Sequence, residues 1–492
     1  MNSKPLLGLK AVASVALVWA LGNSLYVYLL LGGTRTFRVE SAVFLLVAAL
    51  LPLVWWNPPR LDSSVAVSAR ASRALALAAG SLWLVALAPF VTLPFLSDDY
   101  VFLASLRSLS DVANVRQFFR PLFAAVFLLL AKVGGGAPLP FHATGLALHA
   151  TSAWLVFLLA RRFFDRMDVA VFCSAVFLLN PLQAEAVLWA SGLQDLLWAG
   201  FALAALVVYT GSRSLTPIRL VVTLLLVVSS LLSKETAVSL VLLLPLADWA
   251  FFRMRRGALQ LTGYLVFVGT LVGYLLLRSR VASIEAAFYT APTRYFVQKF
   301  LSTPYRFFVQ PWNVQVVDVS PAVAWVLTVI VLIALYWAAN RGAGRTALLG
   351  PAVILASTLP VYAYFYVAAD LRGTRYLYFA SVGWALLMAQ TIKSLPVRRL
   401  SFTVVFTSVV LSSFLFLQLN LRPWRTAGEI VDAVSSSVVS GNSVEARSAE
   451  LQRRYGDGLE VRDGVPVVYK GVYLFVNGYP ELCKMMTTGG AR

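Results

Sequence analysis

The chain has 492 residues, of which 59% are hydrophobic and only 13% are charged. Soluble proteins carry about 25% charged residues, so the composition excludes an ordinary soluble domain and favours an all-α polytopic membrane protein. The formal charge of +19 does not indicate a nucleic-acid partner, because many basic residues lie in short loops between apolar runs, where they set membrane topology.

Thirteen apolar segments are about long enough to cross a bilayer as helices. The first of them is too long for a signal-peptide core and lacks a clear small-residue cleavage site, so we expect it to be retained. In chain order the predicted spans are 11–31, 40–56, 74–96, 140–160, 167–188, 193–210, 218–233, 236–252, 259–277, 321–339, 346–367, 376–392 and 400–419.

The basic residues of the short loops predict the orientation. They alternate along the chain so that one face collects them, and this face is expected to be cytoplasmic together with the N-terminus. The other face then receives most of the acidic residues, the long loops 97–139 and 278–320, and the tail 420–492. The sequence therefore predicts a working face and a C-terminus outside the cytoplasm, in the cytoplasmic (inner) membrane of a bacterium.

Shorter segments complete the predicted organisation. Pro121–Ala131 is too short to cross the membrane and is expected to lie at its surface or to re-enter it, and 180–197 resembles a second such dip. The tail 420–492 is predicted to be a small soluble α/β domain with strands at Val465–Tyr469 and Val472–Val476. Cys173 and Cys483 differ too much in depth to pair, so neither a disulfide framework nor a cysteine metal cluster is expected.

The most informative polar feature is the pair Asp98-Asp99, which follows the uncharged run Ala74–Leu96 directly. Two adjacent carboxylates at a membrane surface can accept protons or hold a cation. The alternative interpretation is an acidic helix end that is simply exposed to water.

Basic residues next to the apolar segments are candidates for phosphate binding. Arg120 and Arg375 carry the planar fork that pairs with phosphate, although each could instead be an interfacial anchor. Lys234 forms a possible local ion pair with Glu235, or it is a further phosphate-binding cation. Tyr376 follows Arg375 directly.

Three other groups fall on the same predicted face. Glu185 and Asp195 lie in one bend and either reach the acidic pair, where oxygen ligands could hold a divalent cation, or line a water-filled turn. His142 and His149 share a helix face, where they orient a ligand or pack against a neighbouring helix. Carboxylates and phosphate-binding cations on one membrane face suit the transfer of a group from a lipid phosphate to a hydroxyl.

The order of these motifs resembles that of GT-C membrane glycosyltransferases. The motifs are the acidic pair, Arg-Pro-Leu at 120–122, Phe-His at 141–142, Asn-Pro-Leu-Gln-Ala-Glu-Ala-Val at 180–187, Ser-Lys-Glu at 233–235 and Arg-Tyr-Leu-Tyr at 375–378. The sequence is most similar to the protein O-mannosyltransferase branch, especially the transmembrane and tetratricopeptide-repeat O-mannosyltransferases, and the resemblance covers about 74–419.

The resemblance implies a GT-C fold with an eleven-span catalytic core at 74–419, preceded by two additional spans within 1–73. It implies a polyprenyl-phosphate-linked sugar as donor and an inverting single displacement on the extracytoplasmic side. The same resemblance implies these roles: Asp98 and Asp99 as the catalytic pair, with Asp98 the base; Arg120, Lys234 and Arg375 as donor-phosphate ligands; and His142, Glu185, Asp195, Glu235 and Tyr376 as supporting or acceptor-side residues.

The chain departs from the family pattern in ways that bear on cofactor and acceptor. Asn180 and Gln183 replace both histidines of the family's His-Pro-x-His-x-Glu motif, so metal binding stays open. If a divalent cation such as Mg²⁺ or Mn²⁺ binds, Asp98, Asp99 and Glu185 are its candidate ligands. Tetratricopeptide repeats are absent from this sequence, so the acceptor could be a protein, with mannose as one possible sugar, or an envelope glycan or glycolipid.

A second class of function stays open at this stage. A lipid-linked-sugar transporter or a non-catalytic membrane scaffold would have the same composition and the same membrane-lipid surroundings. A transporter is expected to show repeated halves and helices broken near the middle of the membrane. The sequence shows no such symmetry, and its polar residues gather at one face instead.

Overall fold

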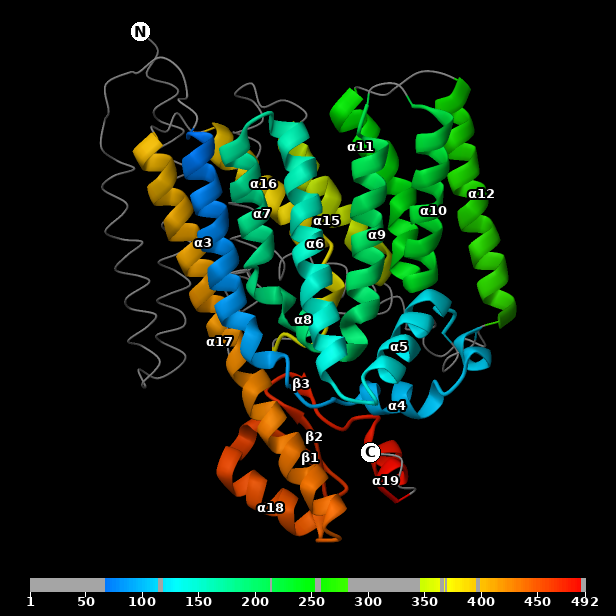
Figure 1. Ribbon diagram of the computed structural model, residues 1–492, viewed down its shortest axis with the longest axis vertical. Helices are drawn as coiled ribbons and strands as arrows, with labels where there is room; N and C mark the ends of the chain where they lie inside the picture. Colours follow the sequence, from blue (N-terminus) through cyan, green and yellow to red (C-terminus); the bar gives the residue numbers. More distant parts are fainter. Residues whose placement is uncertain are drawn as a thin grey trace.

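The computed structural model describes residues 67–113, 118–212, 215–252, 258–281, 346–362, 367, 370–394 and 399–487. The predicted spans 11–31, 40–56 and 321–339 lie outside the described residues, as does most of the loop 278–320. Figure 1 shows the described part as a bundle of long helices with a small domain at one end. We call the end that carries this domain the tail-side end.

The long apolar helices begin within five residues of the predicted spans, but some ends differ: the span predicted at 74–96 ends at Leu87, and the one predicted at 400–419 continues to Val439. They are α3 (Ala69–Leu87), α6 (Leu139–Phe164), α7 (Met167–Leu178), α9 (Leu193–Tyr209), α10 (Pro217–Ser233), α11 (Leu240–Phe252), α12 (Ala258–Val281), α15 (Thr346–Tyr362), α16 (Ala380–Ser394) and α17 (Arg399–Val439). Local sequence fixes several boundaries: Thr216 accepts a hydrogen bond from the Arg219 N–H at the start of α10, and Pro217 occupies its first turn.

Six helical segments of the described chain are long and apolar enough to cross a membrane, or seven if the bent pair formed by α7 and the following short helices is one span. The expectation of a multi-pass helical membrane protein is confirmed, while the total of thirteen spans stays a prediction. The two parts of the bent pair meet at an angle of 42°, where Pro181 interrupts the helix.

The predicted dip at 180–197 is enclosed by protein. Its short helices η3 (Pro181–Gln183), α8 (Ala184–Leu188) and η4 (Ala190–Gly192) consist of buried residues. Non-helical backbone at membrane depth is tolerated where protein covers it, because its polar groups then find partners. Asn180, for example, accepts a hydrogen bond from the Leu182 N–H.

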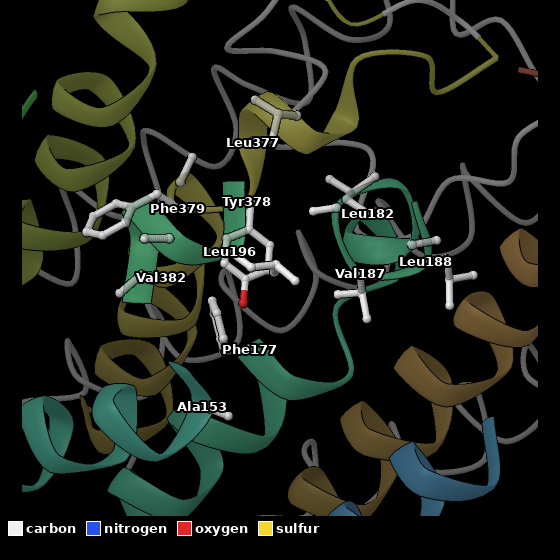
Figure 2. Packing of buried hydrophobic residues seen from close by; sticks show 14 of the residues in the cluster. Ala153, Phe177, Leu182, Val187, Leu188, Leu196, Leu377, Tyr378, Phe379 and Val382 are labelled. Carbon is white, nitrogen blue, oxygen red and sulfur yellow. The ribbon is translucent and has the colours of Figure 1, made fainter. Parts of the chain in front are cut away.

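An aromatic cluster fixes this break against the region that precedes α16. The Tyr378 ring packs edge-on against Phe177, with centroids 5.6 Å apart, and Phe379 stacks on Trp198 at 5.0 Å. Figure 2 shows part of this cluster, in which Val187 of the break also takes part. The packing places the segment 371–377 beside α8 and the start of α9.

The remaining short elements of the core lie between spans. They are η1 (Ala88–Phe90), α4 (Asp98–Ser105), η2 (Leu109–Ala113), α5 (Pro121–Val133), η5 (Glu235–Ser239) and η9 (Thr374–Leu377). Helix α5 begins at the predicted Pro121 and has only 13 residues, which is too short for a span. Figure 1 places α4 and α5 at the tail-side end.

The tail contains α18 (Val444–Tyr455), η10 (Gly456–Gly458), β1 (Leu459–Arg462), β2 (Val465–Tyr469), β3 (Val472–Tyr473) and α19 (Tyr479–Thr487). The strands form an antiparallel sheet in the order β1-β2-β3. Asp463 and Gly464 join β1 to β2 with φ values of 50° and 76°, the positive values that a two-residue hairpin turn requires. The mixed α/β character of the tail is thus confirmed, and β1 is an additional strand.

Two details of the tail differ from expectation. The expected boundary at residue 420 falls inside α17, which continues without interruption from the bundle into the tail. Strand β3 ends at Tyr473 rather than Val476. The Leu474 N–H still donates to the Val467 carbonyl of β2, but the Leu474 carbonyl accepts a hydrogen bond from the Ser97 N–H of the core. Cys173 is buried and Cys483 is partly buried, and the two do not form a disulfide.

Candidate active site

The acidic pair begins α4, immediately after a strained residue. Ser97 has φ 44° and ψ −110°, a region that residues other than glycine rarely adopt. Strain of this kind persists only where the surroundings impose it, and it gathers at functional sites. The two carboxylates that follow Ser97 lie in very different environments.

Asp99 is completely buried and is held by three hydrogen bonds. Its Oδ2 accepts from the Leu96 N–H at 2.9 Å, and its Oδ1 accepts from the Ser191 N–H at 2.7 Å and from the Ser191 hydroxyl. Trp189 adds a bond from its Nε1–H to the Leu96 carbonyl at 3.1 Å. Asp99 therefore anchors the acidic loop to the α8–α9 break.

Burial raises the pKa of Asp99 from its ordinary 3.8 to about 7, although the bonds from Ser191 and Leu96 act in the opposite direction. The folded state consequently binds more protons than the unfolded state between about pH 4 and pH 7, so the contribution of Asp99 to stability decreases as pH rises through that window. We expect the difference between the melting temperature of the wild type and that of Asp99→Asn to decrease as the pH is raised from 5 to 8. A difference that is constant with pH would contradict this assignment.

Asp98 is only partly buried, and its Oδ1 accepts a hydrogen bond from the side-chain amide of Asn477 at 2.7 Å. The pair thus separates into a buried anchor and a more accessible carboxylate. Of the two, only Asp98 is placed to meet a substrate without unfolding of the loop.

The three predicted phosphate-binding cations each form an ion pair with a carboxylate that the sequence had also singled out. Arg120 binds Glu235 through two nitrogens, at 2.8 Å from Nε and 2.5 Å from Nη2. Lys234 Nζ lies 2.5 Å from Asp195 Oδ1, and both side chains are at most 3% exposed.

The third pair joins Arg375 to Glu185. The Nη1 of Arg375 donates to Glu185 Oε1, while Glu185 Oε2 accepts from the Arg375 N–H at 3.1 Å and from the Thr374 hydroxyl at 3.2 Å. Glu185 is 4% exposed, so its charge depends on these donors. The pairing brings η9 against α8.

Aromatic rings connect the ion pairs to one another. The Arg375 guanidinium lies 4.7 Å from the centroid of the Trp189 ring and 4.8 Å from that of the Tyr376 ring. Lys234 Nζ lies 4.7 Å from the same Tyr376 centroid. Cations at these distances are attracted to the ring faces. Gln194, next to Asp195 in the chain, accepts a hydrogen bond from Arg120 Nη1 and so joins the first pair to the others.

The structure thus brings together nearly all of the predicted site residues. One network contains Asp99, Arg120, Glu185, Asp195, Lys234, Glu235, Arg375 and Tyr376, with Asp98 at its edge. His142 is placed elsewhere: its Nε2 contacts the Leu93 carbonyl at 2.8 Å, inside the packed end of α6. His149 likewise contacts Tyr378 and the Leu178 carbonyl.

The candidate cation ligands are already occupied by protein donors. Both oxygens of Asp99 and both of Glu185 accept hydrogen bonds from the chain. Within the described ranges no group of three histidine, cysteine, aspartate or glutamate side chains is arranged to hold a metal ion. The described residues therefore do not fit a divalent cation at Asp98, Asp99 and Glu185.

A small pocket adjoins the Arg375–Glu185 pair. It is lined by Glu185 and Thr374, by Asn420 and Trp424 of α17, and by Gly471 of the tail. The space inside it is about that of one water molecule, so a sugar or a lipid phosphate would not fit without movement of this region.

Four contributors to the network were not assigned a role from the sequence: Trp189, Ser191, Gln194 and Asn477. Three of them, Trp189, Ser191 and Gln194, lie within the predicted dip at 180–197. Polar and aromatic residues in such a break are candidates for a functional site, so the sequence could have indicated them. Asn477 is followed by Gly478, and this Asn-Gly sequence indicates a turn rather than a site residue.

The fold and the network define a multi-pass membrane protein with a charged, aromatic-lined centre at its tail-side end. No protein-family model matches the chain. The chain is similar to Protein O-mannosyl-transferase F38B6.6 of Caenorhabditis elegans, with 24% identity over 379 residues that cover 71% of this chain and 52% of that protein. It is also 34% identical, over 134 residues, to Protein O-mannosyl-transferase Tmtc1 of Drosophila melanogaster, covering 26% of this chain and 15% of that protein.

The resemblance to protein O-mannosyltransferases that the motifs indicated is therefore confirmed. The chain spans about half the length of the first of these relatives, and both relatives are eukaryotic. Among solved structures, it resembles ArnT from Cupriavidus metallidurans, bound to undecaprenyl phosphate and in the apo state. The TM-scores are 0.46 and 0.47, the identities are 15% and 14%, and the matches cover 75% and 76% of this chain and 81% of ArnT in each case.

Proposed function

We propose that the chain is an inverting GT-C glycosyltransferase that moves a monosaccharide from a polyprenyl-phosphate donor to an acceptor hydroxyl on the extracytoplasmic side of the membrane. The observation that carries the proposal is the position of Asp98, an accessible carboxylate at the edge of a network that holds three cations. The similarity to protein O-mannosyltransferases supports the same class of reaction.

The proposed reaction is a single displacement. The acceptor oxygen forms a bond to the anomeric carbon while the bond from that carbon to the phosphate oxygen breaks. Asp98 accepts the proton of the acceptor hydroxyl, and the sugar–phosphate bonding electrons leave with the lipid phosphate. Attack from the side opposite the leaving group inverts the anomeric configuration.

Arg375 and Lys234 have the most suitable geometry for the leaving phosphate. Within the described residues, Nε of Arg375 makes no hydrogen bond, and Lys234 Nζ makes one. All three guanidinium nitrogens of Arg120, in contrast, are directed to Glu235 and Gln194. Donors that are already held in place can stabilise the developing charge without reorganising.

This difference between the arginines can be measured. We expect Arg375→Gln to raise the KM for the donor about tenfold or more, because a charge-assisted bond to phosphate is lost. Arg120→Gln should raise that KM less, since Arg120 contributes mainly by holding Glu235 and Gln194. Donor titrations on equal amounts of folded protein test this order, and the reverse order would contradict it.

The reaction itself is tested with the purified full-length chain in lipid nanodiscs. A panel of polyprenyl-phosphate sugars, including the mannose donor, is supplied with serine- and threonine-containing peptides or with glycan acceptors, and release of the lipid phosphate is followed. We expect release that depends on the acceptor and an inverted linkage in the product. A protein that moves the donor across a vesicle membrane without consuming it would instead be a transporter.

A further inference from the structure

A segment of the tail lies directly on the loop that carries Asp98. We call residues 474–478, which connect β3 to α19, the strap. The strap contacts the core through its backbone and its side chains, although it is separated from the acidic pair by more than three hundred residues of sequence.

The strap is fitted closely to the strained residue before the pair. The Ser97 N–H donates to the Leu474 carbonyl at 2.6 Å. Gly478 is so close that a Cβ at this position would lie 2.1 Å from the Ser97 carbonyl oxygen, which excludes any other residue without movement of the backbone. Phe475 stacks on Tyr100 with ring centroids 5.9 Å apart. These contacts hold Ser97 in a conformation that it would not adopt alone.

Asn477 extends from this clamped segment to the proposed base. Its Nδ2 donates to Asp98 Oδ1 at 2.7 Å. An amide is a neutral donor, so it can fix the direction of a carboxylate without the strong charge pairing that Arg375 and Lys234 impose on Glu185 and Asp195.

We propose that Asn477 is a positioning residue for Asp98, through which the tail completes the active site. The inference rests on the proposed function, since it assigns a role relative to the base of that reaction. The tail is then a part of the catalytic unit, joined to the bundle by the uninterrupted helix α17 on one side and by the strap on the other.

The test compares Asn477→Ala with Asn442→Ala in the full-length chain. Asn442 is an exposed residue of the same tail, in the turn between α17 and α18, where its backbone N–H donates to the Ser437 carbonyl of α17. We expect Asn477→Ala to lower kcat about tenfold with the donor KM unchanged, because a small displacement of a catalytic group is costly. Asn442→Ala should match the wild type. A wild-type kcat for Asn477→Ala would overturn the proposal.

Hydrogen exchange separates positioning from docking of the tail. The Ser97 N–H bonds to a backbone carbonyl, so its protection should persist in Asn477→Ala. If activity and Ser97 protection are lost together, the residue holds the strap in place and the positioning role is wrong. The isosteric Asn477→Asp fills the same space but removes the donor and opposes a second carboxylate to Asp98, so we expect a larger loss of kcat than in Asn477→Ala. Retained activity in Asn477→Asp would also overturn the proposal.

Asp98→Asn, assayed in parallel, distinguishes the two proposals. If Asp98→Asn is inactive and Asn477→Ala has wild-type kcat, only the role of Asn477 fails. If Asp98→Asn keeps full activity, the assignment of the base fails, and with it the proposed mechanism.

Discussion

Asp98→Asn is expected to lower kcat for sugar transfer by about a hundred- to ten-thousandfold, because an asparagine cannot accept the proton of the attacking hydroxyl. The donor KM should change little, since the cations proposed to bind the phosphate belong to other elements. The substitution is isosteric and affects a partly exposed side chain, so the folded fraction should stay close to that of the wild type. Steady-state transfer assays with saturating donor provide the measurement.

Asp99→Asn is the matched control, because it makes the same chemical change one residue away. Asp99 is fully buried and accepts bonds from Leu96 and Ser191, so its replacement acts on the stability of the loop. We expect a changed melting temperature and a smaller loss of kcat than for Asp98→Asn. Equal losses of kcat in both variants, with equal folding, would argue that the two carboxylates act as one unit.

Lys234→Met is expected to have the largest effect on stability, about 3–5 kcal/mol, because it leaves Asp195 as an uncompensated buried charge. The second oxygen of Asp195 already lacks a hydrogen-bond partner within the described residues, so after the loss of Lys234 the charge would be offset by the more distant cations Arg120 and Arg375. Thermal unfolding in detergent, followed by the loss of tertiary signal, measures the effect.

The double variant Lys234→Met with Asp195→Leu should recover most of that stability, since replacing both partners removes the buried charge. Its transferase activity should stay low, because a cation proposed to bind the leaving phosphate is gone. Breaking the exposed Arg447–Glu450 pair by Arg447→Ala is the comparison, and it should change stability little. If the double variant is as unstable as the single variant, the cost does not come from the unpaired carboxylate.

Sequence patterns predicted the helices well, because continuous apolar runs and their interruptions follow directly from the requirements of a bilayer. Helix α6 begins one residue before its predicted span, and α9 and α10 lie within one residue of theirs. The same physics identified the cations and carboxylates of the site, because charged residues beside apolar runs are costly and stand out.

The pairing of those charges could not be derived in the same way. Arg120 meets Glu235 across 115 residues and Arg375 meets Glu185 across 190, and such contacts depend on how the helices pack. Asn477 is the clearest case: an Asn-Gly sequence indicates a turn. Only the path of the strap across α4 reveals that its side chain reaches Asp98.

The one-to-one pairing of cations and carboxylates has a consequence for turnover. The three ion pairs Arg120–Glu235, Lys234–Asp195 and Arg375–Glu185, which we call the cradle, contain three positive and three negative charges, so the cradle as a whole is neutral. A cradle with three unbalanced cations would hold the lipid phosphate product, which carries more charge than the donor diester, too tightly to release it. In the proposed reaction the paired carboxylates would compete for the same donors and limit that affinity, so that the spent carrier could depart and the next donor could enter. Product inhibition by free polyprenyl phosphate should accordingly be weak in the wild type.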